Sequence, residues 1–208
     1  MHKALCLVMF ILSTALCVLA LPTAAVAQAI DACDWEAGHP SDPDRVGPGI
    51  GSGDVNTERA IAACRRAVER EPENARFHYQ LGRALVYAAD REGTDWQVGM
   101  PHLEKSAALE HRQAMFVLGL MHKRAGDVCA SEPLTRGAAD LGLKSARISY
   151  VNDYLSGSLD ACPPRASLEA MQGYLEAARG QVSGYYENML LDALDRHLAV
   201  AVAAGESP

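Results

Sequence analysis

The sequence predicts an all-α fold, a right-handed α-solenoid of about four helical hairpins that follows an irregular N-terminal segment. The first observation behind this prediction is a short pattern that occurs three times. Its copies reach a second helix at Phe77, Ala114 and Ala146, and the steps between these residues are 37 and 32. A period in this range is typical of stacked helical hairpins, each of which buries its apolar face only against its neighbours.

The second observation is that apolar residues recur at helical spacing within each copy. Residues 57–70 form the first predicted helix, and Pro72 ends it. The second helix of this hairpin has Asn74 as its cap and buries Phe77, Leu81, Ala84, Leu85 and Ala88. Gly82 lies inside this second helix and Gly119 repeats it in the next copy. Because glycine costs about 1 kcal/mol against alanine in a helix, we expect these glycines to let the first helix of the hairpin approach closely.

The later hairpins follow the same order. A loop from 89 to 99 precedes a second hairpin of residues 100–109 and 112–125. The third hairpin is expected at 131–141 and 144–155, and a weaker fourth at 166–179 and 183–204. The last helix is long and amphipathic, so we interpret it as the terminal cap that repeat arrays require.

The N-terminus predicts export. Lys3 gives a positive start, an apolar stretch follows from residue 4 to 21, and Ala25-Val26-Ala27 forms a small-x-small cleavage site. These features are typical of a secretory signal peptide cleaved after Ala27, with an uncleaved anchor as the alternative. We therefore divide the chain into a signal peptide (1–27), an irregular N-terminal segment (28–56) and a repeat domain (57–208), and expect a periplasmic or secreted protein without a stable membrane span after signal removal.

Composition excludes one class of partner. Removal of the signal leaves 18 basic and 26 acidic residues, a net charge of −8. Binding to nucleic acid needs a basic surface, so we expect no nucleic-acid partner.

Four cysteines lie beyond the signal peptide, and an even number in an exported chain indicates disulfides. They are Cys33, Cys64, Cys129 and Cys162, which allow three pairings. We favour Cys33–Cys64 and Cys129–Cys162 because each pair joins neighbouring elements. A zinc site is the alternative, but the chain has no C-x-x-C pair and the spacings of 31, 65 and 33 fit no metal knuckle.

The residues of the second copy resemble a known family. This copy carries Lys105-Ser106-Ala107-Ala108 at the end of its first helix and Leu118-Gly119 in its second. It resembles the Sel1-like repeat, a relative of the tetratricopeptide repeat, as found in exported proteobacterial envelope proteins. The resemblance covers about residues 57–157; the third copy departs from it, since Tyr150-Val151 stand where leucine-glycine is expected. The family implies a right-handed solenoid that binds proteins and has no catalytic residues.

No residue pattern predicts chemistry. The six histidines after residue 27 include no H-E-x-x-H motif and no pair four residues apart, so we expect solvated surface histidines and no metal site. The chain has no G-x-S-x-G motif, and pairing the cysteines removes a thiol nucleophile. We therefore expect no catalytic residue, no cofactor and no enzyme activity.

A basic column is the candidate binding feature. When the copies are aligned, Arg65, Lys105 and Arg136 fall in one column on successive first helices, which usually line the concave face of such arrays. This stripe would suit an acidic protein or peptide partner; solvated charges that happen to share a sign are the alternative. Trp96, in the 89–99 loop, is a second candidate anchor as an exposed aromatic.

These features together predict a non-enzymatic protein–protein interaction scaffold in the bacterial cell envelope. The alternatives are an enzyme-associated module acting on envelope polymers or thiols, and a secreted host-facing binding protein. A titratable cluster in a cleft would favour the enzyme-associated module.

Overall fold

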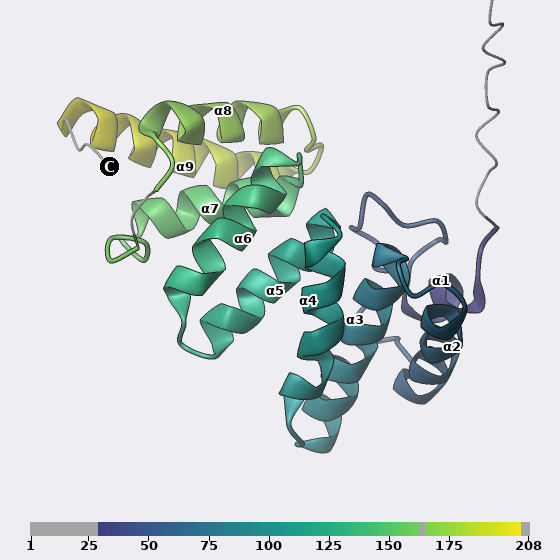
Figure 1. Ribbon diagram of the computed structural model, residues 1–208. Helices are drawn as coiled ribbons and strands as arrows, with labels where there is room; N and C mark the ends of the chain where they lie inside the picture. Colours follow the sequence, from purple (N-terminus) through teal and green to yellow (C-terminus); the bar gives the residue numbers. More distant parts are fainter. Residues whose placement is uncertain (1–28, 163–164, 205–208) are drawn as a thin grey trace, which may run out of the picture.

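The computed structural model describes residues 29–162 and 165–204, and within these ranges it is all-helical, with no strand. Figure 1 shows the helices following one another in chain order across the molecule, each packed against its sequence neighbour. The helices are α1 (Ala32–Ala37), α2 (Thr57–Arg70), α3 (Ala75–Glu92), α4 (Met100–Ala108), α5 (Arg112–Arg124), α6 (Val128–Asp140), α7 (Lys144–Leu155), α8 (Leu168–Arg179) and α9 (Tyr185–Ala204), with a short 3-10 helix η1 (Trp96–Gly99) before α4. The predicted signal peptide lies outside the described residues.

The predicted helices correspond to α2–α9, with differences at their ends. Helix α3 continues to Glu92, four residues into the predicted loop, because no residue before Gly93 breaks it. Gly93 ends it in the left-handed conformation, at a φ of 66°. Helix α6 begins at Val128 rather than at residue 131, because the Asp127 side chain accepts a hydrogen bond from the Ala130 N–H and caps the earlier start.

Gly82 and Gly119 do permit a close approach, but the helix that approaches belongs to the next pair, not to the same hairpin as predicted. A Cβ atom on Gly82 would lie 2.9 Å from the Leu103 side chain in α4 and 3.1 Å from the Gly99 carbonyl oxygen. A Cβ atom on Gly119 would lie 2.8 Å from Thr135 Oγ1 in α6. The small residue therefore sets the spacing between successive pairs.

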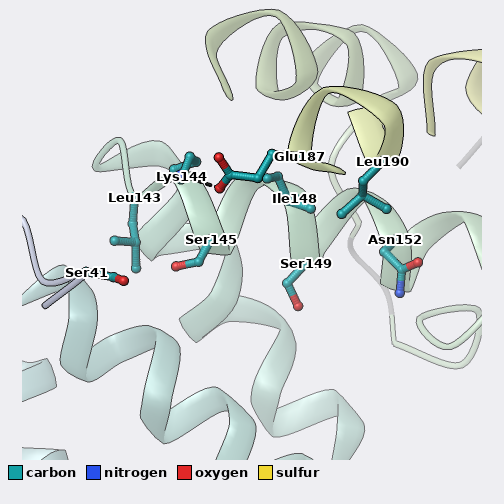
Figure 2. A pocket seen from close by; sticks show the side chains of 9 residues that line it. All are labelled: Ser41, Leu143, Lys144, Ser145, Ile148, Ser149, Asn152, Glu187 and Leu190. Carbon is teal, nitrogen blue, oxygen red and sulfur yellow. Dashed lines mark hydrogen bonds and ion pairs between the residues drawn. The ribbon is translucent and has the colours of Figure 1, made fainter. Parts of the chain in front are cut away.

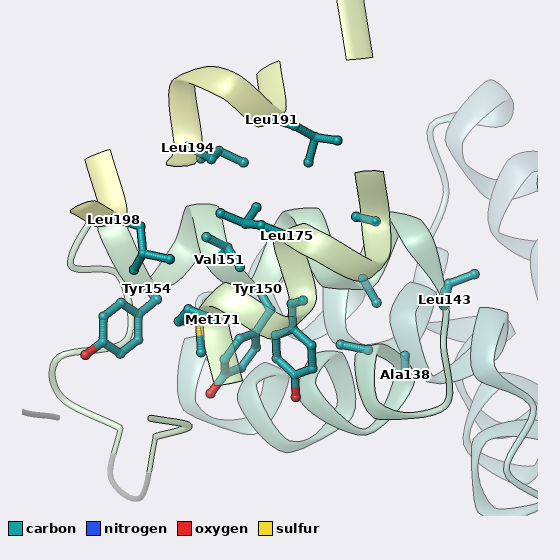
Figure 3. Close-up of a cluster of buried hydrophobic side chains, with 14 of the residues drawn as sticks. Ala138, Leu143, Tyr150, Val151, Tyr154, Met171, Leu175, Leu191, Leu194 and Leu198 are labelled. Atoms are coloured by element: carbon teal, nitrogen blue, oxygen red, sulfur yellow. The ribbon is translucent and has the colours of Figure 1, made fainter. Parts of the chain in front are cut away.

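Among the described residues, the core consists of three clusters that follow one another along the chain. The first joins α1, α2 and α3, and the second joins α3, α4 and α5. The third, drawn in Figure 3, joins α6–α9 around Tyr150, Met171, Leu175 and Leu191. Each cluster draws on helices that are close in sequence, as expected when every pair buries its apolar face against its neighbours.

Both favoured cysteine pairs lie at disulfide-bonding distance. The Sγ atoms of Cys33 and Cys64 are 1.94 Å apart, and those of Cys129 and Cys162 are 1.92 Å apart. The first pair joins α1 to α2, and the second joins α6 to the turn after α7. Two such pairs fit an extracellular or periplasmic protein. Among the described helices, none has the length and apolar character of a membrane span.

The irregular N-terminal segment is held by arginines of α3 and α5. Arg76 contacts the buried Asp34 at 2.7 Å. Arg83 donates to the carbonyl oxygens of Ala37 at 2.8 Å and Ile50 at 2.8 Å. Asp44 accepts from Arg112 of α5 at 2.6 and 2.8 Å. These bonds satisfy buried backbone acceptors and a buried carboxylate, so the segment docks against α3 and α5 although it contains only the six-residue helix α1.

Candidate functional site

A groove runs across α3, α5 and α7. It consists of two pockets of about 450 and 320 Å³ that share Ser41 and Ser145 and therefore adjoin. We call the first the α7 pocket and the second the α3–α5 pocket. Ser41, a residue of the N-terminal segment, lines both pockets on one side.

The α7 pocket is lined by one face of that helix. Figure 2 shows Ser145, Ile148, Ser149 and Asn152 along α7, with Glu187 and Leu190 of α9 on the other side. The spacing of the α7 residues, three and four apart, places them on a single helical face. Lys144 and Glu187 form an ion pair at 2.6 Å at the edge of the pocket, so the charges there balance.

The α3–α5 pocket is more apolar. Helix α5 contributes Phe116, Val117, Leu120 and Met121, which again share one helical face. Helix α3 contributes Tyr79, Arg83, Val86 and Tyr87 at equivalent spacing. The Arg83 guanidinium already donates to carbonyl oxygens of the N-terminal segment, so the charge that faces the groove is engaged within the protein.

Residues at equivalent positions of the recurring sequence pattern line both pockets. Tyr79, Phe116 and Ile148 are 37 and 32 residues apart, the same steps that separate the copies of the repeat. They form one column across the three helices, in which Phe116 and Ile148 are partly exposed and Tyr79 is buried. The column was visible in the sequence as the position two residues before Leu81 and Leu118, but sequence reasoning did not single it out because it assigned the binding face to the first helices of the hairpins.

The predicted basic column lies on other helices. Arg65, Lys105 and Arg136 are on α2, α4 and α6, and none of them lines the groove. Lys105 contacts Glu73 at 2.7 Å, and Arg136 contacts Glu132 at 2.8 Å. Arg65 is exposed and has no ion pair among the described residues. Two charges of the column are thus balanced within the protein, which weakens its attraction for an acidic partner.

Trp96 is not the exposed aromatic that the sequence predicts. It is half-buried against the cluster of α3, α4 and α5. The Arg124 guanidinium lies 4.7 Å from the centre of its ring. A cation over the ring and apolar contacts beneath it give Trp96 a structural role within the protein.

The expectation of solvated histidines is wrong for His78 and His111. Of the six after residue 27, only His197 is exposed. His78 and His111 are buried, and His78 Nδ1 lies 3.0 Å from His102 Nδ1. Burial lowers the pKa of His39 and of His102. These histidines pack between helices because the docked N-terminal segment and the neighbouring helix pairs cover them, which sequence spacing does not reveal.

A buried polar cluster lies next to the wall of the groove. Asp42 follows Ser41 in the chain and faces His111, the N-cap residue of α5. Burial raises the pKa of Asp42 to about 6 and lowers that of His111 to about 4. Both shifts follow from the cost of placing a charge away from water.

Searches of protein-family models, curated proteins and solved structures found no match to this chain. The resemblance to Sel1-like repeats therefore stays a prediction, and function has to be argued from the groove.

Proposed function

We propose that the protein is a non-enzymatic protein–protein interaction scaffold of the bacterial cell envelope, and that it holds an extended segment of a partner protein in the groove across α3, α5 and α7. The observation that carries this proposal is that Phe116 of α5 and Ile148 of α7, at equivalent positions of the sequence pattern, line the two adjoining pockets and are partly exposed there. Repeat proteins commonly bind extended chains along a surface that successive pairs of helices form together, and these two side chains supply apolar contacts from successive pairs.

The proposal includes a right-handed solenoid of Sel1-like hairpins. It is supported by the packing of each helix against its sequence neighbour and by the regular steps between equivalent residues. It also includes export through the signal peptide at residues 1–27, supported by two cysteine pairs at disulfide-bonding distance.

The lining of the groove defines the chemistry of the partner segment. Apolar side chains of α5 form the floor, while Ser145, Ser149 and Asn152 offer hydrogen-bonding groups along α7. The charges at its edge are paired. We therefore infer a largely uncharged segment in which apolar residues alternate with residues that hydrogen-bond, rather than the acidic segment that the basic column would suit.

Two substitutions on α9 test the groove. Leu190 and Val200 are both exposed apolar residues of this helix, but only Leu190 lines the α7 pocket. The ligand is a peptide selected against the wild-type protein from a displayed random library, and affinity is measured by isothermal titration calorimetry. We expect Leu190→Asp to weaken binding by at least about 10-fold, because a charge would be desolvated, whereas Val200→Asp should bind like wild type.

A photo-crosslinking residue then identifies the natural partner. Placed at Ser149 in the groove, it should capture a discrete protein in cells, and Leu190→Asp should abolish the product. The matched position is the exposed Glu104 on α4, where no product is expected. Two outcomes would overturn binding in the groove in favour of the basic column. One is capture of a protein from position 104 alone. The other is loss of capture only in the combined alanine variant of Arg65, Lys105 and Arg136.

A further inference from the structure

Three ligand-type side chains converge beside the groove. Asp42 and Asp44 come from the N-terminal segment, and His111 is the N-cap residue of α5. One donor atom from each lies within 4.8 Å of the other two. Sequence spacing could not suggest this cluster, because the histidine and the carboxylates are distant in the chain and only the docked segment brings them together.

Two of the facing atoms have no hydrogen-bond partner in the described part of the chain. Asp42 Oδ2 and His111 Nε2 are 3.5 Å apart, and both side chains are almost entirely buried. Leaving a buried acceptor or donor without a partner is costly. A distance of 3.5 Å is long for a hydrogen bond, but it is close to the roughly 3.3 Å that separates two ligands of a tetrahedral zinc ion with bonds of about 2.0–2.1 Å.

We propose that Asp42, Asp44 and His111 bind a divalent zinc ion. Imidazole nitrogen suits zinc, and carboxylate oxygen completes the set, whereas a site for calcium or magnesium would be built from oxygen atoms alone. The proposal stands independently of the partner-binding function of the groove.

The surrounding contacts suit such a site. Asp42 Oδ1 accepts a hydrogen bond from the Asp44 N–H at 2.9 Å. This bond orients the Asp42 carboxylate and leaves its Oδ2 atom facing His111. Asp44 binds Arg112 through both oxygens, and each carboxylate oxygen has a further lone pair for a metal. The ring of Tyr79 stacks on that of His111 at 5.0 Å and limits its rotation. These contacts hold the three ligand side chains in place, as outer contacts do at metal sites, while the Arg112 cation competes with the metal for Asp44.

Coordination through Nε2 has one structural consequence. His111 Nδ1 now accepts a hydrogen bond from the Ala114 N–H at 3.3 Å. A neutral imidazole that coordinates through Nε2 carries its proton on Nδ1 and cannot accept this bond. Zinc binding should therefore release the Ala114 amide, and its NMR resonance should shift.

The ion would also fix the wall of the groove. Asp42 and Asp44 follow Ser41, which lines both pockets, and His111 begins a helix that forms the floor. A bond from each side to one ion would tie the segment to α5.

The test uses tag-free protein treated with a chelator and titrated with zinc chloride by isothermal titration calorimetry. We expect one site in the wild type. Asp42→Asn should weaken binding by at least about 10-fold, with His111→Gln as a second variant. The control is His197→Gln on α9, because His197 is the exposed histidine among the described ones and would account for surface binding. Circular dichroism of each variant checks its fold, and Co²⁺ in place of Zn²⁺ should give the absorption bands of a tetrahedral site in the wild type.

Loss of zinc binding in Asp42→Asn and His111→Gln but not in His197→Gln, together with a shift of the Ala114 amide, supports the site. The proposal is overturned if the wild type does not bind zinc, if folded Asp42→Asn binds it like wild type, or if only His197→Gln loses it. Tighter binding of Ca²⁺ than of Zn²⁺ would also overturn it.

Discussion

At the scale of single residues, buried charges decide how the N-terminal segment docks. Asp34 is fully buried, and its carboxylate contacts Arg76 at 2.7 Å and accepts from Gln80 Nε2 at 2.9 Å. Its second oxygen also accepts from the Asp31 N–H at 2.9 Å. A buried carboxylate needs this full set of partners because desolvation of an ion is expensive. The sequence shows only an acidic residue in an irregular segment, so the role of Asp34 follows from the structure alone.

We expect Asp34→Ala to lower the free energy of unfolding by about 3–5 kcal/mol, because it removes one partner of a buried ion pair and also the acceptor of the Gln80 amide. Urea denaturation measures this difference. The matched control is Glu73→Ala, which removes the Lys105 ion pair from an exposed carboxylate. An exposed pair contributes about 0–1 kcal/mol. Equal losses in the two variants would contradict a special role for Asp34.

At the scale of elements, local patterns predicted the helices and distant contacts determined the rest. Helices α2 and α7 begin and end where their apolar stripes and caps predicted. The docking of the N-terminal segment depends on hydrogen bonds such as that from Arg83 to the Ile50 carbonyl oxygen, which no local pattern encodes. The groove could be predicted in part. Alignment of the three copies of the sequence pattern places Tyr79, Phe116 and Ile148 in one column, but it does not show that the second helices line the groove.

The glycines give a prediction at this scale. Propensity alone predicts that Gly82→Ala stabilises α3 by about 0.5–1 kcal/mol. The added Cβ would instead lie 2.9 Å from the Leu103 side chain and 3.1 Å from the Gly99 oxygen. We expect this overpacking to lower the free energy of unfolding by about 1–3 kcal/mol, as measured by urea denaturation.

Gly173 provides the comparison, because it lies inside α8 and a Cβ atom there would meet nothing within 4 Å among the described atoms. Gly173→Ala should raise the free energy of unfolding by about 0.5–1 kcal/mol. Stabilisation by both alanines would show that α4 moves away from α3 at little cost.

At the scale of the whole molecule, the two disulfides lie in different parts of the structure and differ in burial. Cys33–Cys64 lies in the cluster of α1, α2 and α3, where both side chains are fully buried. Cys129–Cys162 links α6, whose residues join the cluster of α6–α9, to the turn after α7, and Cys129 is exposed. The two halves of the array should therefore differ in their response to reductant.

We expect a limiting amount of dithiothreitol to open Cys129–Cys162 before Cys33–Cys64, because exchange requires a thiolate to reach a sulfur atom. Timed alkylation followed by peptide mapping measures the order. The entropy of closing a loop of 33 residues corresponds to about 3–4 kcal/mol, so the partly reduced protein should lose stability first in α6–α9, seen as faster amide exchange there. The Cys129→Ser, Cys162→Ser double variant should show the same exchange pattern without reductant. Opening of Cys33–Cys64 first would contradict the role of accessibility, and a uniform rise in exchange along the chain would mean that the clusters unfold as one cooperative unit.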